Sequence, residues 1–137
     1  MKKKIISIFI IILLTTGCTT IESNSYDEIL TKTTNTIVNT TNINRVGYKY
    51  YLPKGMRLLS YEGSNEIISH DENIYYLYVD YVSYYNKIPS SYTESQTAVY
   101  SKNILKDKKF GYIEIKNTEN DKYFIEIMYN YAKIEVI

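Results

Sequence analysis

The sequence is poor in the residues that most often build catalytic and metal sites. Its 137 residues include one cysteine, one histidine, two prolines and no tryptophan. A single cysteine excludes a disulfide within the chain. With only one histidine beside it, zinc clusters of the usual ligands are excluded as well. We therefore expect no cofactor, no metal and no catalytic residue, and a protein that is not an enzyme.

Outside the N-terminus the sequence also has no large excess of positive or negative charge. The chain carries 16 basic and 15 acidic side chains, and three of the lysines stand together at residues 2–4. The remainder is slightly acidic and has no long basic run, so it lacks the positive surface by which proteins bind nucleic acid. We expect no nucleic-acid partner.

Long apolar runs are absent too. The most apolar stretch, Ile5 to Leu14, is interrupted by Ser7, and it is shorter than the roughly 20 residues that a membrane span needs. A basic start, a short apolar run and small residues after it are typical of a secretory signal. The sequence thus predicts a signal at 1–17, a polar tether at 18–24 and one domain at 25–137.

The predicted signal ends in Leu14-Thr15-Thr16-Gly17-Cys18, which resembles the lipobox of bacterial lipoproteins. Gly17 and Cys18 match the motif, whereas Thr15 stands where an aliphatic residue is usual. The resemblance implies cleavage between Gly17 and Cys18, and acyl chains such as palmitate on a diacylglyceryl group at the Cys18 thiol. It also implies an anchor on the outer face of the cell membrane. The alternative is an ordinary cleaved signal followed by a free cysteine.

The periodicity of apolar residues predicts one helix followed by strands. Tyr26, Ile29, Leu30 and Thr33 recur at helical spacing, so we expect a helix over about 26–40. Alternating residues and turn signals predict strands after it, at 47–52, 56–61, 65–69, 74–84, 97–105, 110–116, 122–129 and 131–137. We expect a loop at 42–45, and a long loop or lid at 86–95. The expected fold is α+β, with the helix packed on a largely antiparallel meander sheet of about six or seven strands.

The sequence stops inside its last alternating segment, at Val136-Ile137. A domain normally ends in a few polar, loosely held residues, and one helix is too small to cover so large a sheet. We therefore expect that the intact relative continues past Ile137 into a second helix, which lies beside the first.

A Pro-x-Gly turn follows the first long strand, in Tyr50-Tyr51-Leu52-Pro53-Lys54-Gly55-Met56. This order looks like the PsbP-like domains of photosystem extrinsic proteins and of some bacterial lipoproteins. The resemblance covers about residues 45–85 and carries no site with it, and ordinary turn geometry also favours Pro-x-Gly. In its general design the chain resembles the small lipoproteins of Gram-positive bacteria.

The polar clusters in the chain have ordinary explanations. His70 lies beside Asp71 and Glu72 in a predicted hairpin tip, which we interpret as a solvated turn. A second turn gathers lysines, which form a solvated hairpin end or a small anion-binding spot, at Lys102, Lys106, Lys108 and Lys109.

Seventeen tyrosines are the most unusual feature of the composition. Tyrosine fills strands well, but it also provides rigid binding surfaces with one polar group. We therefore predict a binding or accessory module of the cell envelope, whose partner is an envelope protein or a cell-wall polymer and whose binding face carries Tyr76, Tyr78, Tyr123 and Tyr129. The alternative is a cell-wall glycan hydrolase with a carboxylate pair, drawn from Asp80, Glu114 and Glu126.

Overall fold

The computed structural model describes residues 24–35, 40–119 and 122–137. Its first element is helix α2, Asn24–Asn35, which belongs to a different compact unit from the strands. The predicted helix is therefore present, but it starts two residues earlier. Its predicted part at 36–39 lies outside the described residues, and Thr40 is not helical. Inside α2 the Thr34 hydroxyl donates to the Leu30 carbonyl at 2.9 Å, a bond that threonine often makes in helices.

A two-stranded hairpin follows, made of β1 (Ile43–Arg45) and β2 (Tyr48–Tyr50). Gly47 turns the chain with φ of 90°, which a side chain would disfavour. The prediction of a loop at 42–45 is wrong, since this stretch contains β1. The predicted strand at 47–52 shortens to β2, and it pairs with β1 in a separate sheet.

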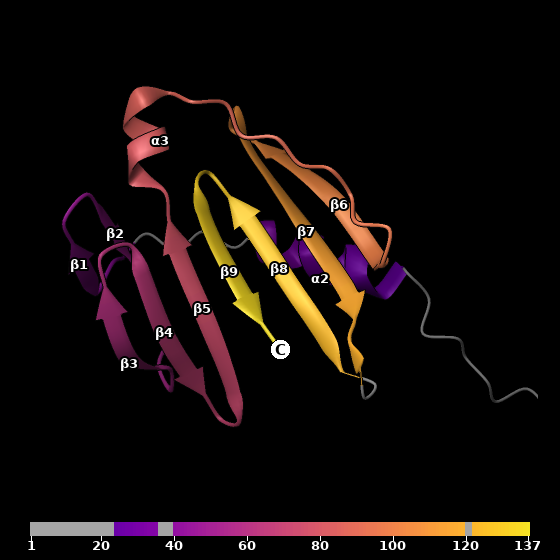
Figure 1. The fold of residues 1–137 in the computed structure, drawn as a ribbon, viewed down its shortest axis with the longest axis horizontal. Helices are drawn as coiled ribbons and strands as arrows, with labels where there is room; N and C mark the ends of the chain where they lie inside the picture. The colour runs from indigo at the N-terminus through magenta and orange to yellow at the C-terminus, as the bar shows by residue number, and fades with distance from the viewer. Residues whose placement is uncertain (1–23, 36–39, 120–121) are drawn as a thin grey trace, which may run out of the picture. The chain divides into compact units, whose positions relative to one another are not determined.

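The remaining strands form one antiparallel sheet in the order β3-β4-β5-β9-β8-β7-β6 (Figure 1). Their bounds are β3 Arg57–Glu62, β4 Asn65–His70, β5 Asn73–Val79, β6 Ala98–Lys106, β7 Lys109–Asn117, β8 Tyr123–Tyr129 and β9 Ala132–Val136. This confirms the α+β fold class, with a short N-terminal helix and a seven-stranded antiparallel sheet, and adds the separate hairpin.

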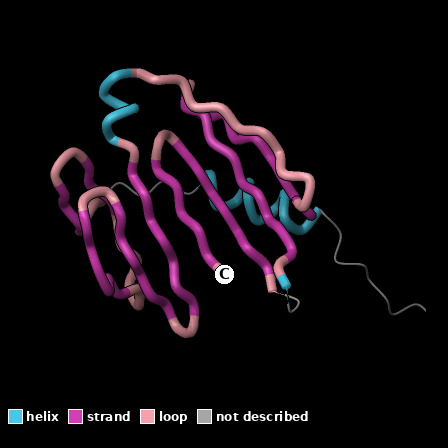
Figure 2. Tube along the Cα trace, in the orientation of Figure 1, coloured by secondary structure: helices cyan, strands magenta, loops and turns pink. Residues whose placement is uncertain are grey.

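The sheet is not one continuous meander. After β5 the chain forms helix α3, Tyr81–Asn86, and then runs as a loop to the far edge of the sheet, where β6 begins (Figure 2). From there β7, β8 and β9 return toward the middle. Strand β9 therefore pairs with β8 on one side and with β5 on the other. The predicted loop at 86–95 is this crossing segment.

The predicted long strand at 74–84 is wrong in its second half. The chain leaves β5 at Val79, and Asp80 starts α3 by accepting a hydrogen bond from the Ser83 amide at 2.9 Å. An aspartate at this position satisfies one of the free amides of a helix start. Lys87 ends the helix in the left-handed conformation, with φ of 54°. Local capping thus outweighs the apolar alternation that favoured a strand.

The two faces of the sheet differ in chemistry, because residues opposite each other on neighbouring strands share a face. Leu77 pairs with Ile134, Ile134 with Ile127, and Ile127 with Ile113; this row belongs to what we call the apolar face. Tyr76 pairs with Glu135, Glu135 with Glu126, and Glu126 with Glu114. That row belongs to the opposite side, which we call the polar face.

Candidate functional site

The apolar face contains a cavity with a volume of about 530 Å³. Aliphatic side chains of the sheet contribute to its wall, including Ile68, Leu77, Val79 and Ile134. Eight tyrosines complete the lining, from β2 and the residue after it, from α3 and from the stretch around the β8–β9 turn: Tyr48, Tyr50, Tyr51, Tyr81, Tyr84, Tyr85, Tyr129 and Tyr131. We refer to this feature as the tyrosine cavity.

Helix α3 presents three of these tyrosines on one side. Residues three and four apart share a side of a helix, so Tyr81, Tyr84 and Tyr85 lie together. The ring of Tyr81 stacks at 6.5 Å on that of Tyr48 in β2, and the ring of Tyr84 meets that of Tyr131 edge to face at 5.9 Å. The aromatic rings thus link α3 to the hairpin and to the β8–β9 turn.

The hairpin is fixed to the sheet by one buried carboxylate. The Glu66 side chain on β4 is fully buried, and Arg45 of β1 donates to its two oxygens at 3.1 and 3.2 Å. The hydroxyls of Tyr48 and Tyr50 donate to the same oxygens at 2.7 and 2.5 Å. Four donors therefore satisfy the buried charge, and they hold the tyrosines of β2 at the cavity wall.

The hydrogen bonds to Glu66 change the pKa values of the groups that donate them. Burial, together with the hydrogen bond to Glu66, raises the pKa of Tyr48 and of Tyr50 well above the ordinary phenol value. Desolvation opposes the charge of Arg45, but the hydrogen bond to Glu66 and the electrostatic attraction of Glu66, Tyr50 and Tyr48 together outweigh it and raise the pKa of the guanidinium. All three groups therefore remain protonated donors at neutral pH.

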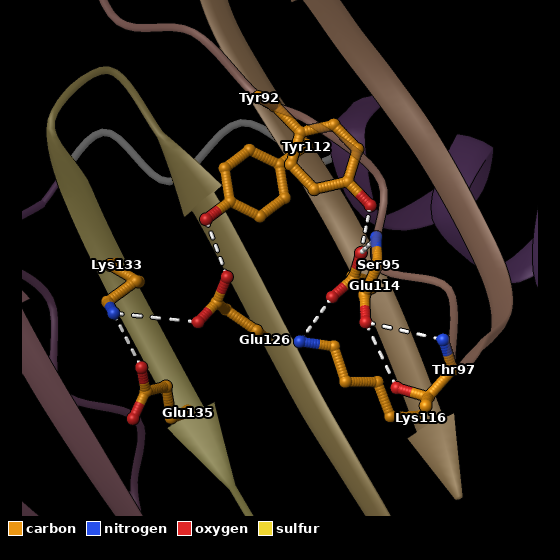
Figure 3. A network of polar contacts seen from close by, with 9 residues as sticks. All are labelled: Tyr92, Ser95, Thr97, Tyr112, Glu114, Lys116, Glu126, Lys133 and Glu135. Carbon is orange, nitrogen blue, oxygen red and sulfur yellow. Dashed lines mark hydrogen bonds and ion pairs between the residues drawn. The ribbon is translucent and has the colours of Figure 1, made fainter.

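The polar face carries a network of charged side chains across β7, β8 and β9 (Figure 3). Glu126 accepts from the Tyr112 hydroxyl at 2.6 Å and lies 3.5 Å from the Lys133 ammonium. Lys133 also reaches Glu135 at 2.6 Å. The hydrogen bond from Lys133 lowers the pKa of Glu135, and the bond to Glu135 raises that of Lys133. Both groups are therefore ionised at neutral pH.

Glu114 anchors the crossing segment to the same face. It accepts from the Lys116 ammonium at 2.5 Å, the Ser95 amide at 2.9 Å and the Tyr92 hydroxyl. The Tyr92 ring stacks on Tyr112 at 4.1 Å. Burial alone would raise the pKa of Glu114, but the bonds from Lys116, Ser95 and Tyr92 outweigh it and lower that pKa. Burial and the bond to Glu114 raise the pKa of Tyr92 to about 12.

The four tyrosines of the predicted binding face do not lie together. Tyr76 and Tyr78 are exposed on the polar face, opposite Glu135 and Lys133. Tyr123 and Tyr129 alternate with Glu126 along β8, so they point to the apolar side. Only Tyr129 contributes to the tyrosine cavity.

The three predicted carboxylates separate in a similar way. Glu114 and Glu126 are cross-strand partners, whereas Asp80 caps α3 instead of standing on a strand. The bond from the Ser83 amide lowers the pKa of Asp80. The structure therefore brings two of the three together, each with its own hydrogen-bond donors.

The other predicted clusters are turns, as expected. Asp71 has φ of 52° in the tip between β4 and β5, and His70 lies 3.7 Å from its carboxylate. Asp107 and Lys108 form the tip between β6 and β7, both with positive φ. Within the described part of the chain, no three His, Cys, Asp or Glu side chains converge on a possible metal site.

Gly17 and Cys18 lie outside the described residues, as does the apolar run at 5–14. In the portion that is described, no helix combines the length and apolar character that crossing a membrane requires. Lipidation and cleavage at these two residues stay predictions.

Sequence reasoning missed Glu66 and the tyrosines of α3. Glu66 is a lone acid beside Ile67 and Ile68 in a predicted strand, which is a signal for a buried, paired charge. Asp80 three residues before Ser83 is a helix-start signal, and it would have placed Tyr81 and Tyr84 on a helix. Arg45, the partner of Glu66, gave no signal, because it lay in a predicted loop.

Comparison with known proteins adds no relative. A scan against protein-family models found no match, and searches of curated proteins and of solved structures found none either.

Proposed function

We propose that this protein is a membrane-anchored lipoprotein of the cell envelope whose sheet domain is a binding module. The observation that carries the proposal is the tyrosine cavity, which combines aliphatic side chains and eight aromatic ones in about 530 Å³. Small-molecule sites are typically concave and mostly apolar, with few polar groups. The lipobox-like end of the signal, Gly17-Cys18, supports an anchor on the outer face of the membrane.

The lining defines the class of ligand for this cavity. Its wall is aliphatic and aromatic, and phenol hydroxyls supply polar groups. Several of those hydroxyls already donate within the protein, as Tyr48 and Tyr50 do to Glu66. An apolar ring or chain, carried by an envelope protein or a cell-wall polymer or free in solution, fits this environment best.

The proposed membrane anchor is tested by cell fractionation of the Cys18→Ala variant, with Thr19→Ala as the matched control. The variant is expected in the soluble fraction and the control in the membrane fraction. If Cys18→Ala stays as membrane-bound as the parent, the lipoprotein proposal is wrong, and the run at 5–14 is an uncleaved anchor.

The binding half is tested with a small aromatic probe and the full chain in lipid nanodiscs. We expect the chain to broaden the ¹⁹F NMR line of 4-fluoroacetophenone beyond the broadening by empty discs. Ala132→Phe fills the cavity and should abolish the effect, whereas Ala98→Phe on the edge strand β6 should keep it. Equal broadening by all three chains would contradict the proposed cavity.

The alternative function, a glycan hydrolase, rests on the pairing of Glu114 with Glu126. Retaining glycosidases use two carboxyl groups about 5 Å apart. The Cβ atoms of cross-strand partners are also about 5 Å apart, so the side chains of Glu114 and Glu126 start from neighbouring positions. One of the two groups must be a protonated acid, and that requires a raised pKa. The lowered pKa of Glu114 suits only the ionised role, but its side chain is 2% exposed and already accepts from Lys116, Ser95 and Tyr92, so it is not free to attack a sugar. This geometry favours a binding module over a hydrolase.

A further inference from the structure

The polar face has a further concave region, on the opposite side of the sheet from the tyrosine cavity. Two hollows of about 380 and 290 Å³ adjoin there, and both are lined by Tyr78 and Lys133. The two hollows share Leu77, Asp80 and Tyr131 with the lining of the tyrosine cavity. The larger extends over β4 and β5, as far as Asn65 and Ile67. The smaller extends to residues 88–91 of the crossing segment. Together they form an elongated depression, which we call the polar groove.

Two tyrosines give the polar groove an aromatic surface. Tyr76 and Tyr78 are 47% and 41% exposed, although they belong to an inner strand of the sheet. As residues i and i+2 of one strand, they lie about 7 Å apart on the same face. The face of an aromatic ring is negative, so it attracts the weakly positive C–H bonds on the flat side of a sugar ring.

Charged groups beside these rings can serve sugar hydroxyls. Each tyrosine lies opposite a charged residue of β9, Tyr76 opposite Glu135 and Tyr78 opposite Lys133. The Lys133 ammonium and the Glu135 carboxylate form an ion pair at 2.6 Å. Each of the two side chains is about a third exposed or slightly less. A hydroxyl both donates and accepts, so it can bond the carboxylate and the ammonium at once.

The charge balance of the polar groove selects against polyanions. Among its lining residues, Glu66, Asp80 and Glu135 are acidic and Lys133 is basic. Glu66 is buried and paired with Arg45, so Asp80 and Glu135 supply the negative charge. Glu126, which contacts Lys133, adds another negative charge. A phosphate-rich or carboxylate-rich polymer would be repelled, whereas a neutral chain with many hydroxyls would not.

We propose that the polar groove binds an extended, neutral glycan, with sugar rings stacked on Tyr76 and Tyr78 and hydroxyls bonded to the Lys133–Glu135 pair. This site lies on the opposite face of the sheet from the tyrosine cavity. It does not depend on whether that cavity binds an apolar ligand.

Titration calorimetry of the full chain in nonionic detergent tests the proposal, with chitohexaose, cellohexaose and maltohexaose as neutral probes and polyphosphate as the anionic one. At least one neutral glycan is expected to bind. Tyr78→Ala and Tyr76→Ala should each weaken that binding at least tenfold. Tyr123→Ala is the matched control, because Tyr123 is 51% exposed, lies on the opposite face and lines neither hollow.

Tyr78→Phe separates a stacking role from a loss of folding. It keeps the ring, so it should retain most of the affinity that Tyr78→Ala loses, and circular dichroism verifies that both variants fold. The proposal is overturned if no neutral glycan binds, if polyphosphate binds more tightly, or if Tyr123→Ala weakens binding as much as Tyr78→Ala. The ¹⁹F probe of the tyrosine cavity reports independently, so failure at one site is distinguishable from failure at the other.

Discussion

Glu114 on β7 lies directly opposite Glu126 on β8, and each of these carboxylates has its own lysine. Lys116 contacts Glu114 at 2.5 Å, and Lys133 lies 3.5 Å from Glu126. Like charges opposite each other destabilise a sheet, so the two lysines offset a repulsion that the register creates. The same pairing is the basis of two predictions.

The first concerns hydrolysis. The full chain should release no soluble sugar fragments from purified peptidoglycan. The lowered pKa of Glu114 makes it unsuitable as the general acid, and its burial under Lys116, Ser95 and Tyr92 keeps it from a sugar as the nucleophile. The measurement is reducing-sugar release over a day. Release that disappears in both Glu114→Gln and Glu126→Gln would instead establish the hydrolase.

The second concerns acid stability. Since the pKa of Glu114 is lowered in the folded protein, its contribution to stability is complete above the unfolded carboxyl value of about 4.3. That contribution is lost as the pH falls through the lower, folded value. Urea midpoints at pH 6 and pH 3 should therefore differ less in Glu114→Gln than in the parent. Glu62→Gln, at an exposed site on the edge strand β3, is the control and should retain the parent's difference.

A third prediction concerns the buried Glu66. Tyr50→Phe removes a hydroxyl that donates to this carboxylate at 2.5 Å. Losing a hydrogen bond to a charged group costs about 1.5–3 kcal/mol, so the free energy of unfolding in urea should fall by that amount. Tyr51→Phe changes an exposed neighbour and should have little effect. Equal losses in the two variants would show that the hydroxyl of Tyr50 does not stabilise Glu66.

A fourth prediction concerns Gly111 on β7. A Cβ atom there would lie 2.9 Å from the Tyr129 ring and even closer to the Met128 carbonyl. Gly111→Ala should therefore lower the free energy of unfolding by about 1–3 kcal/mol, as overpacking does. A Cβ atom at Gly63 would have no neighbour within 4 Å. Only the positive φ of 58° at this position disfavours alanine there. A smaller loss at Gly63 supports the steric explanation, and a larger one contradicts it.

Alternation along single strands was enough to predict the sheet. Neighbouring residues of β8 such as Ile125 and Glu126 lie on opposite faces of the sheet, as the alternation of side chains along a strand predicts. The turn between β4 and β5 was equally clear, because polar residues such as Asp71 separate two apolar segments.

The strand order was not predictable in the same way. Which strand pairs with β9 depends on contacts between distant parts of the chain, such as Tyr75 opposite Val136, and no local pattern encodes them. The Glu66 site was not predicted for the same reason, because its partner Arg45 lies 21 residues away in the sequence. Helix α3 was not predicted because its Tyr and Val residues favour strands. The capping bond that starts the helix depends on a single residue, Asp80, which is a weak signal in the sequence.

The place of β9 between β5 and β8 has a consequence for the time course of folding. Among the described strands β9 comes latest in the chain, yet it joins β3–β5 to β6–β8. Until residues 132–136 have been synthesised, β5 and β8 each present an unpaired edge. Pairing β9 with β5 then closes a loop that contains α3 and β6–β8. Closing such a loop costs entropy before its contacts repay it, and this slows folding. Assembly of the complete sheet therefore waits for its central strand.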